Sequence, residues 1–95
     1  NLGKGVDYVF GIDVGRFSDQ SEVCVWKYIP QTGTTSTKHL VNIYSFEQMH
    51  FAEQAIEIKL LYEKYHPRAV VIDGAGVGAG LIDELIKSQV DVRTN

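Results

Sequence analysis

Apolar and polar residues change their spacing several times along the chain, and each change marks an expected secondary-structure element. Residues 8–14 and 69–73 are short apolar runs, typical of strands buried inside a sheet. β-Branched and aromatic residues over 22–29 and 38–46 enclose the turn-forming segment 30–34. These two runs therefore predict a pair of strands joined as a hairpin.

Two other segments have the spacing of amphipathic helices. Apolar residues recur at helical intervals from Phe51 to Tyr65, and Pro67 is expected to stop this helix after His66. A second apolar stripe predicts a helix over about 78–88, and the residues from Val90 onward resemble the start of another strand. The predicted order is β-β-β-α-β-α.

This order favours an α/β fold with a mixed sheet and helices packed on it. Three strands that can meander antiparallel lead through a helix to a fourth strand that can lie parallel to the first. A right-handed crossover would place this fourth strand beside the first. The expected spatial order of the strands is 3-2-1-4. Asp13 and Asp73 end the first and fourth strands, so this order makes them neighbours at the carboxyl edge of the sheet.

Composition limits the chain to one folded domain. It has 95 residues, of which 44% are apolar, enough for a packed core. Nothing approaches the ~20 apolar residues of a membrane span. The net charge of −3 offers no broad basic surface for nucleic acid, although an acidic metal site would itself add negative charge. The lone Cys24 is expected to be a small apolar residue inside a strand.

The two strand-end aspartates are the strongest candidates for chemistry. A carboxylate set into a buried strand loses solvation and needs a cation, proton or hydrogen-bond donor to compensate. Two of them on adjacent strands would suit Mg²⁺ or Mn²⁺, which prefer oxygen ligands and support two-metal phosphodiester hydrolysis. Gly15, Gly74 and Gly76 would let a phosphate approach this edge closely. We therefore predict Asp13 and Asp73 as metal ligands and catalytic residues.

Both aspartates lie in motifs that resemble those of a known family. The segments are FGIDVGRFSDQSEV at residues 10–23 and VVIDGAGVGAGLIDEL at residues 70–85. They are similar to the first and second nuclease motifs of large terminase subunits from tailed phages. The resemblance covers nearly the whole chain. It implies an RNase H-like fold and a metal-dependent endonuclease that cuts concatemeric viral double-stranded DNA during packaging.

Carried onto this chain, the resemblance makes Asp13 and Asp73 the first two metal-binding acids of a two-metal Mg²⁺ or Mn²⁺ site. It places a third acid beyond residue 95 and a packaging ATPase domain upstream of residue 1. Residues 1–95 would then be a single nuclease-domain fragment with an incomplete ligand set. The implied partners are DNA, the portal and the small terminase subunit, in the cytoplasm of an infected bacterium and away from any membrane.

Several alternatives fit parts of the sequence. A nucleotide-binding lobe of the actin and sugar-kinase type shares the element order, a Holliday-junction resolvase shares the fold and metal chemistry, and a docking module could keep the fold without activity. The glycine-rich turn after Asp73 also fits a dinucleotide fingerprint, against which the adjacent carboxylate argues. Asp19 and Arg16 are expected to be solvated loop residues, and Asp83 to stabilise a helix N-terminus.

Overall fold

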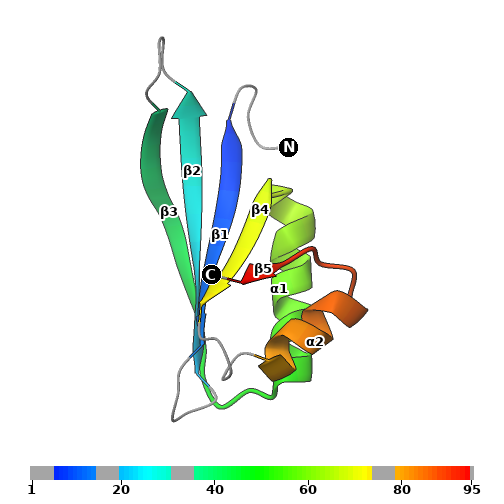
Figure 1. Ribbon diagram of the computed structural model, residues 1–95. Helices are drawn as coiled ribbons and strands as arrows, with labels where there is room; N and C mark the ends of the chain where they lie inside the picture. The colour runs from blue at the N-terminus through cyan, green and yellow to red at the C-terminus, as the bar shows by residue number, and fades with distance from the viewer. Residues whose placement is uncertain (1–5, 15–19, 31–35, 74–78, 95) are drawn as a thin grey trace.

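A mixed sheet with two helices on one side forms the molecule (Figure 1), and the computed structural model describes residues 6–14, 20–30, 36–73 and 79–94. The elements follow in the order β1 (Asp7–Val14), β2 (Ser21–Pro30), β3 (Ser36–Phe46), α1 (Phe51–Tyr65), β4 (Ala69–Asp73), α2 (Ala79–Lys87) and β5 (Arg93–Thr94). The predicted β-β-β-α-β-α order is confirmed, and the strand expected after Val90 is β5.

The five strands lie in the spatial order β3-β2-β1-β4-β5. Strand β1 pairs antiparallel with β2 and parallel with β4, and β5 adds a parallel edge beside β4. The predicted order 3-2-1-4 is therefore confirmed and extended by one strand. The amide of Arg68 donates to the carbonyl oxygen of Tyr8 at 2.8 Å, so the chain leaving α1 is attached to β1 where β4 begins.

Helix α1 ends where the sequence predicts. His66 takes a left-handed conformation with φ of 50°, and its amide donates to the carbonyl of Tyr62 at 2.9 Å before Pro67 prevents continuation. At the other end, the fully buried Gln54 donates from Nε2 to the carbonyl of Met49 at 2.8 Å. This side chain therefore fixes the turn that leads from β3 into the helix.

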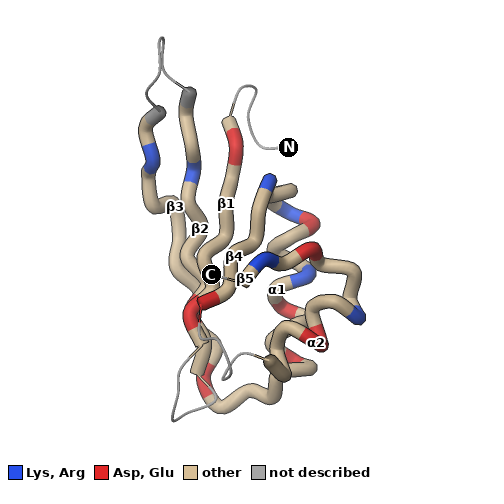
Figure 2. The backbone as a smooth tube through the Cα atoms, viewed as in Figure 1, with Lys and Arg blue, Asp and Glu red and all other residues tan. Residues whose placement is uncertain are grey.

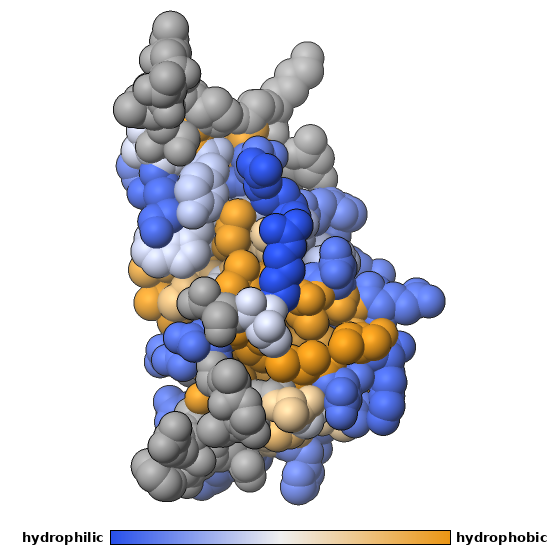
Figure 3. All heavy atoms as spheres, in the orientation of Figure 1, coloured by the Kyte–Doolittle hydropathy of each residue, from blue (hydrophilic) through white to orange (hydrophobic). Residues whose placement is uncertain are grey.

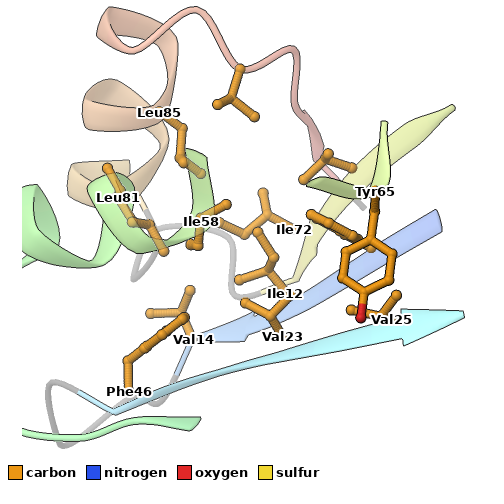
Figure 4. Close-up of a cluster of buried hydrophobic side chains, with 14 of the residues drawn as sticks. Ile12, Val14, Val23, Val25, Phe46, Ile58, Tyr65, Ile72, Leu81 and Leu85 are labelled. Carbon is orange, nitrogen blue, oxygen red and sulfur yellow. The ribbon is translucent and has the colours of Figure 1, made fainter. Parts of the chain in front are cut away.

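The core lies between the sheet and the helices (Figure 4). Alternation along β1 and β4 sends every second side chain to the helix side, where it is buried. Labelled members of the cluster are Ile12, Val14, Val23, Val25, Phe46 and Ile72 from the strands, and Ile58, Tyr65, Leu81 and Leu85 from the helices. Burial of this cluster on one face fixes which strand residues point to the other face.

The opposite face of the sheet has no helix among the described residues. Its side chains include Val9, Cys24, Trp26 and Val71, all half-buried. The indole Nε1 of Trp26 lies 3.9 Å from the position that a Cβ on Gly11 would occupy, so the ring lies across β1. In the view of Figure 3, apolar side chains are also exposed over the middle of the molecule and toward α2.

Candidate metal centre

Asp13 and Asp73 are neighbours across the sheet. They are Cα partners in the parallel pairing of β1 with β4, which places their Cα atoms about 4.8 Å apart. Ile12 and Ile72, one residue earlier in each strand, are buried on the helix side. Because strand side chains alternate, both carboxylates project from the opposite face. The structure thus brings together the two acids that the sequence singles out.

The environment of the two acids differs from one expectation. The sequence suggested carboxylates partly desolvated by a buried strand, whereas Asp13 and Asp73 are both exposed. Each is the last or second-last residue of its strand, so water reaches it from the sheet edge. The charged forms are therefore solvated, and a cation held between the two carboxylates would offset their mutual repulsion rather than desolvation.

A third carboxylate, Glu22, lies beside Asp13 and was missed by sequence reasoning. Asp73, Asp13 and Glu22 together form an acidic row across the sheet. Glu22 is the antiparallel Cα partner of Asp13, is exposed, and projects from the same face because Val23 is buried on the other. Ser45 on β3 continues the row, and its Oγ donates to Glu22 Oε2 at 3.5 Å. Glu22 could have been found by extending the predicted hairpin register to β1. Figure 2 shows acidic positions gathered near these strand ends.

The acidic side chains of this row are spread across the sheet and do not converge on one common centre. Within residues 6–14, 20–30, 36–73 and 79–94, no three His, Cys, Asp or Glu side chains are grouped closely enough to hold a metal ion. Asp13 and Asp73 nevertheless supply paired oxygen donors at the spacing of adjacent strands, a set that suits hard divalent cations. The residues present therefore fit part of a Mg²⁺ or Mn²⁺ site.

Negative potential from this row reaches Cys24, the next residue of β2 on the same face as Glu22. Burial raises the pKa of the Cys24 thiol, and the carboxylates of Glu22 and then Asp13 raise it further. A thiolate at this position would lie among like charges on the same face of the sheet. The raised pKa favours the neutral thiol at Cys24.

Other residues considered in the sequence have less definite positions. Asp83 lies exposed within α2, beyond a first turn that holds no acid, so the expectation that it stabilises the helix N-terminus is wrong. Gly15, Arg16, Asp19, Gly74 and Gly76 lie outside the described residues. No helix among the described residues is both long and apolar enough to cross a membrane.

The mixed sheet of order 3-2-1-4-5 with helices on one face is an RNase H-like fold. Residues 10–95 match the family model described as Terminase RNaseH-like domain. The chain belongs to this family, and the resemblance found in its two motifs is confirmed. Among curated proteins, no sequence matches the chain.

Solved structures support the same fold. The large terminase nuclease from thermophilic phage G20c aligns with a TM-score of 0.72 and 23% identity, covering 95% of this chain and 44% of that chain. The same nuclease with bound magnesium gives 0.71 and 24%, with 95% and 44% coverage. Thermus thermophilus RuvC aligns with a TM-score of 0.63 and 15% identity, covering 93% and 63%. The chain spans less than half the length of the phage nuclease chain.

Proposed function

We propose that this chain is the nuclease domain of a viral DNA-packaging terminase, a metal-dependent endonuclease that hydrolyses phosphodiester bonds in concatemeric double-stranded DNA. The observation that carries this proposal is the register pairing of Asp13 with Asp73 on adjacent parallel strands. Membership of the terminase family and the magnesium bound to a structurally similar phage nuclease support it. The expected portal and small-subunit partners, and a location in the host cytoplasm, belong to the same proposal.

Asp13 and Asp73 would hold Mg²⁺ or Mn²⁺ between them. When bound, such cations activate water and stabilise the leaving oxygen of a phosphodiester. Asp13 lies between Asp73 and Glu22 in the row, so its two oxygens are the best placed to serve two cations. Both aspartates bind and orient the cations, and their exposed position at the sheet edge leaves room for a DNA backbone.

The proposal is tested by metal binding and by DNA cleavage, because a two-acid site could bind a cation without cutting. Mn²⁺ binding is measured by titration calorimetry, and nicking of supercoiled plasmid is measured with Mn²⁺ or Mg²⁺. Asp13→Asn and Asp73→Asn should each weaken Mn²⁺ binding at least tenfold and remove any nicking. Asp83→Asn, which alters an exposed acid on α2, is the matched control and should change neither. Unaltered Mn²⁺ affinity in both site variants would refute the role of the pair.

A resolvase remains a second candidate because RuvC shares the fold. A solved complex of T. thermophilus RuvC holds a Holliday-junction substrate. Cleavage assays should therefore include a four-way junction beside linear duplex of the same sequence. Preferential cutting of the junction would favour a resolvase, whereas equal or better cutting of the duplex supports the terminase function.

A further inference from the structure

An arginine on strand β5 projects from the same face of the sheet as the proposed metal ligands. Arg93 is the Cα partner of Val71, and the next residue, Thr94, is the partner of Ile72. Ile72 is buried on the helix side, so Val71 and Arg93 point to the opposite face. Asp73 lies two residues after Val71 on that same face. Figure 2 shows a basic position on β5 beside the acidic end of β4.

Strand geometry sets the separation between this arginine and the acids. A shift of two residues along the strand and one strand across places the Cα atoms of Arg93 and Asp73 about 8 Å apart. A phosphate held at the carboxylates would thus have a neighbouring phosphate within reach of the guanidinium.

The guanidinium of Arg93 is exposed and makes no hydrogen bond or ion pair with another described residue. The other described arginine differs in this respect. Arg68 lies at the opposite end of β4, where its Nη1 is 3.3 Å from Asp7 Oδ2. Among the described residues, Arg93 is therefore an unpaired, permanently charged group on the face that also carries Asp13, Asp73 and Glu22, and its planar fork matches the oxygens of a phosphate.

We propose that Arg93 binds a backbone phosphate of the DNA adjacent to the phosphate at the Asp13–Asp73 pair, and so positions the strand for cleavage. This inference rests on the proposed nuclease function. A cationic group suits this face, because the chain carries a net charge of −3 and its acidic row repels DNA wherever cations do not neutralise it. A contact to a neighbouring phosphate is made equally before and during bond cleavage, so it strengthens substrate binding.

The test compares Arg93→Gln with Arg68→Gln, which removes the same charge beside the start of the neighbouring strand β4, at the end far from Asp73. Affinity for a fluorescent duplex is measured by anisotropy over a salt series, with Ca²⁺ occupying the carboxylates. Arg93→Gln should weaken binding about three- to tenfold at low salt and reduce the slope of log K against log salt by about 0.9. Arg68→Gln should leave both unchanged. Arg93→Lys should restore the slope, because charge is kept, but only part of the affinity.

Cleavage kinetics and stability separate the remaining explanations. Arg93→Gln should raise KM with little change in kcat, as expected for binding that is uniform along the reaction. A structural counter-ion to Asp73 would instead lower the Tm of the Arg93→Gln variant without altering the salt slope, and that result overturns the inference. Equal behaviour of the two glutamine variants, or no duplex binding by the chain, also overturns it. The nuclease proposal is tested separately, by Mn²⁺ binding and plasmid nicking of the Asp13→Asn and Asp73→Asn variants.

Discussion

Asp13 and Asp73 are register partners on two parallel strands that are 60 residues apart in sequence. Their carboxylates project together from the face that the helices leave open, because Ile12 and Ile72 occupy the buried face one residue earlier. This relationship joins two like charges at the spacing of adjacent strands, about 4.8 Å between Cα atoms. A divalent cation bound between the two carboxylates would relieve that repulsion.

Binding of Mn²⁺ should stabilise the folded chain through this pair. A ligand that binds only the folded state at ten times its Kd adds about 1.4 kcal/mol, which raises the Tm of a domain this size by roughly 6–11 °C. Differential scanning calorimetry with and without Mn²⁺ measures the effect. Asp13→Asn should abolish the rise, and in chelator it should have a slightly higher Tm than the wild type because one repulsive charge is gone. Asp83→Asn should keep the full rise, and its loss there would contradict a site at the pair.

The arrangement of elements was predictable because local pattern and connection rules agree. The alternating or continuous apolar runs located all four main strands. Pro67 predicted that α1 ends after His66, and the last helical residue is Tyr65, with His66 as the C-cap. A right-handed crossover left one position for the fourth strand, beside the first, and the pairing of β1 with β4 confirms it. The boundaries moved little: β3 begins at Ser36, two residues before the predicted strand, because hairpin pairing with Pro30 continues the ladder.

The composition of the site was predictable only in part. Asp13 and Asp73 stand out because each interrupts an apolar run. Glu22 is the first residue of the predicted strand 22–29, and only its register with Asp13 makes it a candidate for the site. Arg93 likewise gains its position from the register of β5 with β4, which the strand expected from Val90 onward did not specify. The solvent exposure of the two aspartates could not be predicted either. It depends on where the neighbouring strands end relative to each aspartate, and the sequence does not specify this.

Core packing between α1 and the sheet should depend on Ile58 far more than on Ile56. Ile58 is 0% exposed in the shared core, whereas Ile56 on the same helix is 58% exposed. Ile58→Ala should lower the free energy of unfolding by about 2–5 kcal/mol, since it removes buried methylenes and leaves a cavity. Ile56→Ala should change it by less than about 0.5 kcal/mol. Urea unfolding followed by circular dichroism measures both, and similar losses would contradict the placement of the α1 core face.

The contact between α1 and α2 requires a glycine at position 80. A Cβ there would lie 2.6 Å from Cδ2 and 2.9 Å from Cε2 of the Phe51 ring. Gly80→Ala should therefore destabilise the chain by about 1–3 kcal/mol through overpacking, although alanine is the better helix former. In a Phe51→Ala background the same change should stabilise by about 1 kcal/mol, because only the helix propensity remains. A double-mutant cycle in urea tests this reversal of sign, and an equal effect of Gly80→Ala in both backgrounds would refute the clash.

The reactivity of Cys24 should report the charge state of the acidic row. Burial, Glu22 and Asp13, in decreasing order, raise the pKa of its thiol, so removing a carboxylate should lower that pKa and increase the thiolate fraction at a given pH. Alkylation by iodoacetamide, which attacks the thiolate, should become faster in Glu22→Gln and, by a smaller factor, in Asp13→Asn. The rate measured from pH 7 to 10 gives the apparent pKa of each variant.

Added Mn²⁺ supplies the decisive comparison for this thiol. A cation at the Asp13–Asp73 pair neutralises the second of the two charges that act on Cys24, so alkylation of the wild type should accelerate when Mn²⁺ is added. Asp73→Asn should lose most of this acceleration, since it removes a metal ligand without altering either acid that raises the thiol pKa. Glu57→Gln, on an exposed position of α1, is the control for a general change in net charge. If Mn²⁺ accelerates alkylation equally in the wild type and in Asp73→Asn, the cation does not sit between the two strand ends.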